Sequence, residues 1–271
     1  MENVYQPPQA NLQQNREPSS GFGRFDFGRN FQLAGSAYGQ QVGLGVGATL
    51  LLPLIAFAMA ITIIGIPFGL PVLAAGMPVF GYMMIRREAS IGDLFSGFRS
   101  YGWVLLAFFL VTVASYIIML PFSLPQILYL YGDFPFGAIG SDSLGEQMQV
   151  WAEALKEKQA NPFNPDYLWR VLVSYGAYPI TMYIGARLQL LYPLIIIRKM
   201  TAIDAIKTSW AVTAPYQWWL MLLYFVAAII AGAGVLLCFV GLLFSIPFSL
   251  ALQGAATYQL FGEDTEGPAP R

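Results

Sequence analysis

The side chains with the clearest chemical potential are a few cations at the edges of long apolar runs. Arg187 lies inside such a run, and two basic pairs, Arg86-Arg87 and Arg198-Lys199, each follow one. An arginine at the centre of a bilayer costs roughly 2.5 to 3.5 kcal/mol on insertion scales, so Arg187 requires a partner, an aqueous cavity or lipid phosphate within reach. The two pairs are suited to anionic headgroups at a membrane surface. These residues indicate anion or lipid binding.

Catalysis has no comparable support in the sequence. The chain has no histidine and a single cysteine, Cys238, so neither an intrachain disulfide nor a Cys/His metal site is expected. It also lacks paired carboxylates within its apolar runs and a glycine-rich phosphate loop. Asp93 and Asp204 follow the two basic pairs at equivalent places, where a carboxylate suits a helix N-terminus, and we predict that they cap helices. We therefore predict a non-enzymatic protein with no catalytic residue, no metal and no cofactor.

The composition is typical of a membrane protein. The chain is 56% apolar and 11% charged, whereas ordinary globular domains have roughly 25% charged residues. Residues 42–85, 100–132 and 208–262 contain no Asp, Glu, Lys or Arg, as expected of helices that face lipid. The net charge is −1 and the basic residues are dispersed, so nucleic acid is not an expected partner. The expected partners are membrane lipids and other membrane proteins.

The uncharged runs are too long to be single spans. As one helix, residues 42–85 would extend roughly 66 Å, about twice the hydrocarbon thickness of a bilayer. A cluster of helix breakers that includes Gly65 and Pro67 divides this run near its middle. We predict an all-α membrane protein in which residues 22–262 form six transmembrane helices as three hairpins, each preceded by a short in-plane amphipathic segment. The spans are expected at about residues 43–64, 68–86, 103–120, 168–197, 218–240 and 244–261.

The polar segments and the basic residues set the predicted orientation. Residues 1–21 are expected to form a disordered cytosolic tail and residues 263–271 a short second one. Residues 132–167 form an extracytosolic loop. With both termini in the cytosol, ten Lys and Arg residues lie on the cytosolic side and three on the opposite side. The positive-inside rule favours this orientation.

Prolines and glycines predict further details of the spans. Pro121 and Pro125 are expected to interrupt the third span, so that residues 123–131 lie along the far membrane surface. The small residues Gly43, Gly45 and Gly47 permit close approach of a second helix, and Gly43 and Gly47 have the nominal spacing of a helix-packing motif.

Three units of the chain repeat one order of features, in which an in-plane amphipathic segment precedes a hairpin with a Pro-Phe break. The stretches that show this best are Pro71–Phe98, Ala202–Trp210 and Gly241–Gly262. In them the chain resembles a broad group of bacterial multi-pass proteins, the YciC-like proteins and the membrane domain attached to some glycerophosphoryl diester phosphodiesterases. The resemblance implies a six-span fold in a bacterial inner membrane. It does not imply phosphodiesterase activity, because no such domain is present.

Two functions are compatible with these observations. In the leading prediction, the protein binds lipid or partner membrane proteins through Arg86, Arg87, Arg198 and Lys199, which lie beside the in-plane segments. In the alternative, it is a small-molecule or lipid transporter or channel in which Arg187 faces an aqueous path or an anionic substrate.

Overall fold

The computed structural model describes residues 22–61, 65–132, 134–135, 139, 143–160, 164–236 and 240–262, and the regular structure in these ranges is helical. The predicted tails 1–21 and 263–271, and Cys238, lie outside the described residues. In chain order the elements are α1 (Phe27–Gln40), α2 (Val42–Ile61), α3 (Gly65–Arg86), the 3₁₀-helix η1 (Ile91–Ser100), α4 (Tyr101–Tyr131), α5 (Leu144–Ala160), α6 (Pro165–Tyr175), α7 (Tyr178–Arg187), α8 (Leu191–Ile196), α9 (Ala202–Thr213), the 3₁₀-helix η3 (Ala214–Tyr216), α10 (Gln217–Leu236) and α11 (Leu242–Leu260).

Five segments of the described chain are long and apolar enough to cross a membrane. Two of them coincide with α2 and α3, and the other three centre on α4, on the run from α6 to α8, and on α10. Their bounds are Val42–Met59, Pro67–Arg86, Ile91–Tyr131, Pro165–Ile196 and Ala202–Leu236. The prediction of an all-α chain with several membrane-spanning helices is confirmed at this level.

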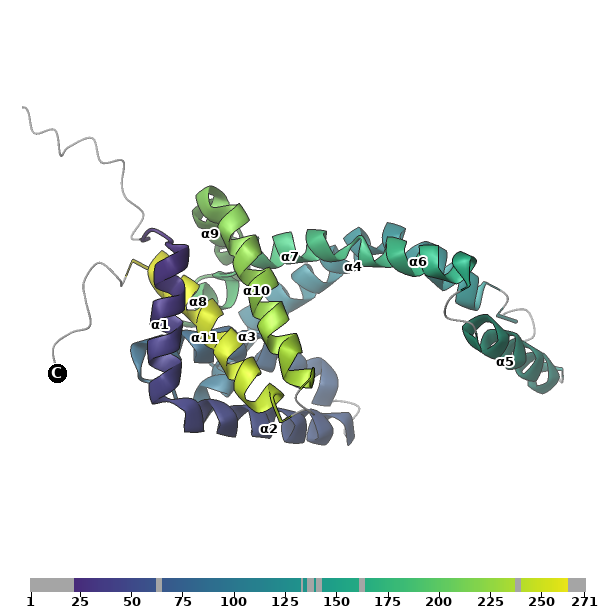
Figure 1. The fold of residues 1–271 in the computed structure, drawn as a ribbon, viewed down its shortest axis with the longest axis horizontal. Helices are drawn as coiled ribbons and strands as arrows, with labels where there is room; N and C mark the ends of the chain where they lie inside the picture. Colours follow the sequence, from purple (N-terminus) through teal and green to yellow (C-terminus); the bar gives the residue numbers. More distant parts are fainter. Residues whose placement is uncertain are drawn as a thin grey trace, which may run out of the picture.

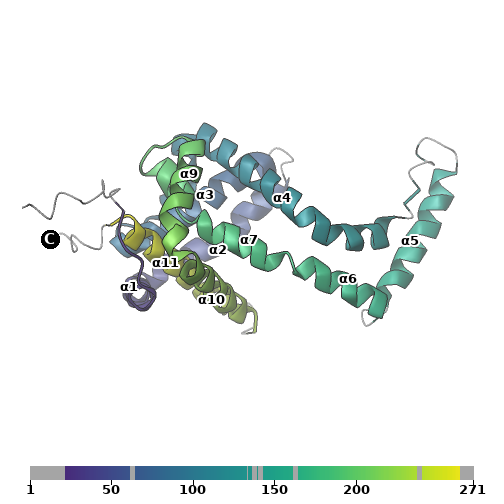
Figure 2. The same ribbon diagram turned by 90° about the horizontal axis from the view of Figure 1, so that it is seen from above.

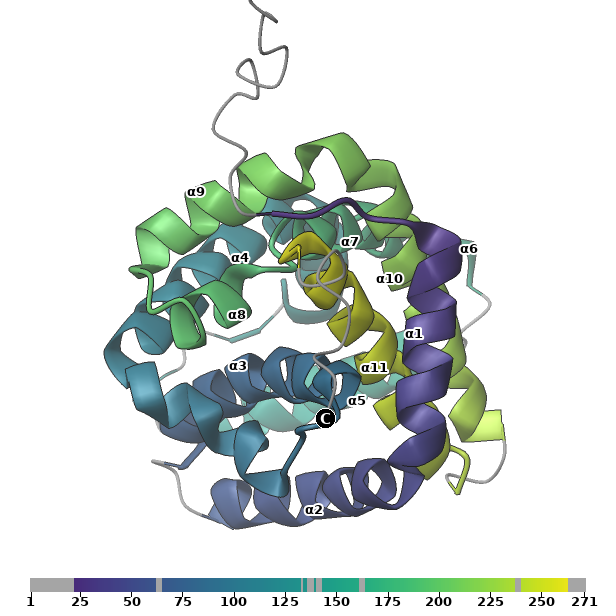
Figure 3. The ribbon, with the colours of Figure 1, turned by 90° about the vertical axis from the view of Figure 1, so that its left-hand side faces the viewer.

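The helices α3 and α11 cross at the centre of the molecule, and α1, α2 and α10 pack around them (Figures 1 and 3). Two glycines make the crossing possible. A Cβ atom at Gly254 of α11 would meet the backbone of Gly81 of α3, and a Cβ atom at Gly81 would meet the carbonyl group of Leu250. Glycine at such a contact lets two helix backbones approach closely.

Of the glycines of α2 that were expected to permit close helix packing, Gly45 does so, whereas Gly43 and Gly47 do not. A Cβ atom at either position of α2 would have no neighbouring atom within 4 Å. The glycine between them in the motif, Gly45, is the one in contact, because its Cβ position lies 2.8 Å from a carbon atom of Pro247. Spacing alone did not indicate which face of α2 meets α11.

An arm of two helical segments extends away from this core. In Figures 1 and 2, α4 and α6 run side by side and α5 lies across their far ends. The hydroxyl group of Ser174 donates a hydrogen bond to the carbonyl oxygen of Phe122 (3.3 Å) and so joins α6 to α4. Trp151 of α5 packs against the rings of Tyr131 and Phe134, with centroid distances of 6.0 Å and 5.1 Å.

The helix α4 does not end at its prolines as predicted. It continues through Pro121 and Pro125 to Tyr131, so residues 123–131 extend the helix. At 31 residues, a helix is about 46 Å long, which exceeds the hydrocarbon thickness of about 30 Å. Proline is tolerated because abandoning the helix in an apolar environment would leave many more backbone groups without partners.

The predicted fourth span, residues 168–197, is divided into α6, α7 and α8. The break between α7 and α8 is held by side chains from other helices. The Leu190 N–H donates to the hydroxyl oxygen of Ser209 (3.2 Å), and the Gln189 amide donates to the backbone oxygen of Gln253 (2.6 Å). The bond to Ser209 of α9 therefore replaces one backbone hydrogen bond that a continuous helix would have made, and the Gln189 side chain ties the break to α11.

The two ends of the described chain meet. The Gly23 N–H donates to the carbonyl oxygen of Leu260 (3.0 Å), and the Asp26 N–H donates to the side-chain oxygen of Gln259 (2.6 Å). Figure 3 faces the end of the molecule where α1 begins and α11 ends.

Candidate functional site

The two basic pairs lie at helix ends with the same backbone conformation. Arg87 follows α3 and Lys199 follows α8, and both have positive φ angles, 62° and 53° respectively. The Arg87 N–H donates to the carbonyl oxygen of Met84, and the Glu88 N–H donates to that of Met83 (both 3.1 Å), which closes the end of α3. A left-handed conformation costs an L-residue roughly 1 to 2 kcal/mol, and glycine is the usual residue there. Both sites carry a cation in spite of this cost.

After each left-handed residue, the next helix begins with a hydroxyl and a carboxylate that cap it. The Ser90 N–H and hydroxyl group both donate to Asp93, at 2.8 Å and 2.9 Å. The Thr201 hydroxyl donates to Asp204 (2.6 Å), and the Asp204 N–H donates back to the Thr201 oxygen (3.3 Å). The prediction that Asp93 and Asp204 cap helices is confirmed.

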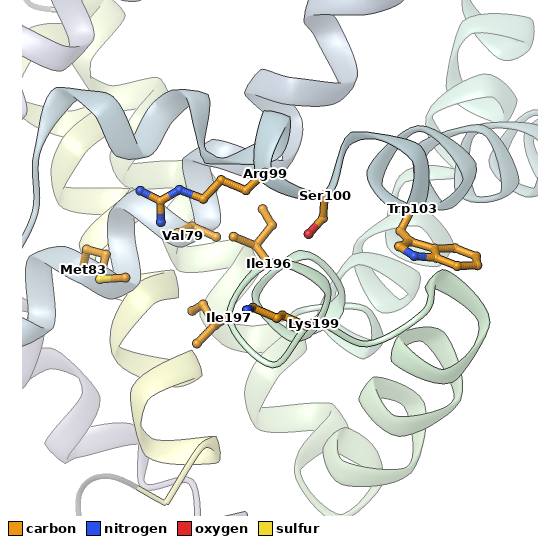
Figure 4. A pocket seen from close by; sticks show the side chains of 8 residues that line it. All are labelled: Val79, Met83, Arg99, Ser100, Trp103, Ile196, Ile197 and Lys199. Carbon is orange, nitrogen blue, oxygen red and sulfur yellow. The ribbon is translucent and has the colours of Figure 1, made fainter.

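A cavity of about 740 Å³ lies between α3, the junction of η1 with α4, and the end of α8. Two cations, Arg99 and Lys199, contribute to its lining, and in Figure 4 their side chains extend toward the same region, with Ile196 between them. The remaining lining residues are mostly apolar and none is acidic: Val79, Met83, Ser100, Trp103, Ile196 and Ile197. The cavity therefore combines two positive charges with an apolar wall.

Close packing of η1 on α3 positions Arg99. A Cβ atom at Gly97 of η1 would lie 2.9 Å from backbone atoms of Val72, and Leu94 of η1 is fully buried. Arg99 comes two residues after Gly97, at the end of η1, and its side chain is exposed. Lys199 is placed by the left-handed turn after α8. Both cations are thus held by rigid backbone next to the core.

The other three predicted headgroup contacts lie elsewhere. Arg86 pairs with Glu88 at 3.3 Å, and Arg87 is exposed at the end of α3. The guanidinium carbon of Arg198 lies 4.4 Å from the ring centroid of Phe22 and 4.6 Å from that of Phe261, so it joins the two chain ends.

The cavity is lined by Lys199 together with Arg99, which the sequence analysis counted only among the cytosolic basic residues. The two are 100 positions apart in the chain, so only packing of η1 and α8 on α3 brings them together. The position of Arg99 at the end of an amphipathic segment was the one signal that could have marked it.

Arg187 is placed in a separate, closed environment. Its side chain is 4% exposed, and its guanidinium carbon lies 4.4 Å from the ring centroid of Trp210 and 6.0 Å from that of Tyr183. The nitrogen atoms Nε and Nη1 are buried and have no hydrogen-bond acceptor. Among the described residues, no carboxylate forms an ion pair with it. Arg187 is not one of the residues that line the cavity of Arg99 and Lys199.

The two cationic features differ in their chemistry. The cavity of Arg99 and Lys199 is open and has an apolar wall, so it can hold an anion with an attached hydrocarbon group. Arg187 is enclosed by aromatic rings and has unused hydrogen-bond donors. Comparison of the chain with protein-family models, with curated proteins and with solved structures gives no match.

Proposed function

We propose that this chain is a non-enzymatic protein of a bacterial inner membrane that binds an anionic phospholipid of the cytosolic leaflet. The cavity of Arg99 and Lys199 holds the headgroup. The observation that carries the proposal is the convergence of these two cations in one cavity without an acidic lining residue. The resemblance to YciC-like bacterial membrane proteins supports the location.

We further propose that the chain crosses the membrane six times with both termini in the cytosol. The contact of Gly23 with Leu260 supports this proposal, because an even number of crossings brings both ends of the described chain to one side of the membrane. The sixth crossing is α11. It carries Gln253, Thr257 and Gln259 and is covered by α1, α2, α3 and α10. A helix that is shielded from lipid by protein does not need to be apolar throughout.

The chemistry of the cavity fits a phospholipid better than a free ion. Each Lys or Arg near an anionic leaflet contributes about 1 kcal/mol of attraction. Trp103 is 46% exposed at the first turn of α4, and an indole at this place suits the boundary between headgroups and acyl chains. Ile196, Ile197 and Val79 offer apolar contacts to the glycerol and upper acyl region.

Retention of lipid by the purified full chain tests the proposal. Wild type in a neutral detergent is expected to retain phosphatidylglycerol in preference to phosphatidylcholine, as counted by native mass spectrometry. The double variant Arg99→Gln with Lys199→Gln is expected to weaken this binding roughly tenfold to thirtyfold, since two attractive charges are lost.

The matched control is the double variant Arg87→Gln with Lys207→Gln. It removes two exposed cations that do not line the cavity, so its retention of phosphatidylglycerol should stay within a few fold of wild type. Equal losses of phosphatidylglycerol in the two double variants would show that net charge alone explains the binding. That result would overturn the assignment of the cavity as the binding site.

A further inference from the structure

Arg187 is a buried cation whose charge is only partly compensated. The contact with Trp210 and the end of helix α7 both favour a positive charge. An aromatic ring face does not replace an oxygen acceptor, however, and Nε and Nη1 remain buried without one. A guanidinium group carries five N–H donors and stays charged at any accessible pH. The described residues therefore supply no hydrogen-bond acceptor for these two nitrogen atoms.

The backbone around Arg187 is held in place by a second helix. The hydroxyl groups of Ser209 and Thr213 on α9 both donate to the Arg187 carbonyl oxygen, at 2.8 Å and 3.1 Å. Ser209 also accepts a hydrogen bond from the Leu190 N–H. These bonds fix the end of α7 against α9, so the guanidinium group does not depend on a flexible loop for its position. A preorganised cation binds an anion at lower entropic cost.

Of the two aromatic rings that lie over this cation, that of Trp210 is the more exposed. Trp210 is 41% exposed, whereas Arg187 beneath it is 4% exposed. Trp210 contacts the edge of the Tyr183 ring at a centroid distance of 6.1 Å, and the Tyr183 hydroxyl donates to Gln217 (3.1 Å). Tyr183 is thus tied to α10, whereas Trp210 is exposed. A ligand that displaces the Trp210 ring would reach Arg187.

We propose that Arg187 anchors a buried site for a single oxyanion, a carboxylate or a phosphate, which enters past Trp210. An oxyanion supplies both missing features, a negative charge and oxygen acceptors for the unused N–H groups. This site is separate from the cavity of Arg99 and Lys199 and does not rest on the proposed phospholipid function. The oxyanion comes either from water, as a free ion, or from the bilayer, as the head of a fatty acid or lipid.

Thermal unfolding of the purified full chain in a neutral detergent tests the site. The probes are acetate, inorganic phosphate and laurate, each titrated at constant ionic strength, with methyl laurate as the uncharged match for laurate. Because a ligand that binds only the folded state raises the melting temperature, wild type is expected to show a saturable rise with at least one oxyanion. A rise with acetate or phosphate identifies the free ion as the source. A rise with laurate but not methyl laurate identifies the bilayer.

The variant Arg187→Gln is expected to raise the midpoint of this titration roughly tenfold to a hundredfold, because it removes a charged donor. The control is Arg170→Gln. Arg170 also stacks on aromatic rings, those of Tyr129 and Trp169 at 4.8 Å and 5.0 Å, but on the arm, and its loss should leave the midpoint unchanged. The double variant at Arg99 and Lys199 should also keep the wild-type midpoint.

Three results would overturn the site. The first is no saturable rise of the wild-type melting temperature with any of the three oxyanions, and the second is equal midpoints in wild type and Arg187→Gln. If Arg187→Gln is not recovered folded, Arg187→Lys takes its place, since it keeps the charge but has fewer donors. It is expected to raise the midpoint roughly tenfold, and an unchanged midpoint is the third overturning result.

Discussion

At the scale of single residues, the placement of the cations is determined by backbone conformation as much as by charge. Arg87 and Lys199 both occupy left-handed positions after a helix, and Gly262 occupies the corresponding position after α11 with φ 78°. Only one of these three residues is the glycine that such a turn favours. At Lys199 the turn places a cation in the lining of the cavity.

The left-handed conformation of Arg87 predicts opposite effects of glycine at two adjacent positions. Arg87→Gly relieves the strain at that residue and is expected to keep or raise stability. Arg86→Gly places glycine in the last turn of α3 and removes the pair with Glu88, and is expected to lower it. The free energies of unfolding of the two variants should differ by about 1 to 2 kcal/mol. Thermal unfolding in detergent measures this, and equal destabilisation would contradict the assigned conformation.

At the scale of elements, the molecule depends on the crossing of α3 and α11. These two helices hold the largest share of fully buried side chains, among them Phe80, Tyr82 and Met84 of α3 and Leu252 and Leu260 of α11. Their contact positions the cavity as well, because η1 packs on the same α3. A change at the crossing therefore reaches both the core and the support of Arg99.

The change of glycine to alanine is expected to have opposite effects at two glycines. Gly254→Ala inserts a methyl group into the backbone of Gly81 and should lower the free energy of unfolding by roughly 1 to 3 kcal/mol. Gly232→Ala in α10 meets open space, with no atom within 4 Å, and should raise it by about 0.5 to 1 kcal/mol. Chemical unfolding in mixed micelles gives both values. A neutral effect at Gly254 would argue against the crossing.

Sequence reasoning recovered the helical class, the apolar segments and the capping carboxylates, because each of these depends on local pattern. It missed the continuation of α4 through Pro121 and Pro125. A proline usually ends a helix in a water-soluble protein, but in an apolar environment the helix continues because the backbone groups have no other hydrogen-bond partner. It also missed the cavity that Arg99 and Lys199 line together and the position of Arg198 between Phe22 and Phe261. These contacts join residues far apart in the chain, and only packing reveals them.

At the scale of the whole molecule, the two ends of the described chain are in contact, since the Gly23 N–H donates to the carbonyl oxygen of Leu260. The even number of crossings that we propose agrees with this contact, because it returns both ends to one side of the membrane. The arm of α4 and α6 extends away from the core, and α5 lies across its far end (Figure 2).

Reporter fusions test this topology. Fusions after residues 86, 140 and 199 are expected to report cytosol, outside and cytosol, since the proposed six-span topology puts residues 86 and 199 on the basic, cytosolic side and residue 140 in the external connection. Activity of a phosphatase reporter, which requires export, measured against a cytosolic fluorescent reporter gives the sign at each site. An exported reporter after residue 199 would rule out six crossings.

The central position of α11 also has a consequence for biosynthesis. It is the last of the described helices to leave the ribosome, yet it packs against α1, α2 and α3, which are made first. The earlier helices are therefore made before α11 can pack between them. The polar side chains of α11 then contact these helices and not lipid. A chain that stops before residue 242 contains all five strongly apolar segments but lacks α11. We expect such a chain to insert into the membrane without completing its fold, and therefore to be a substrate of cellular quality control.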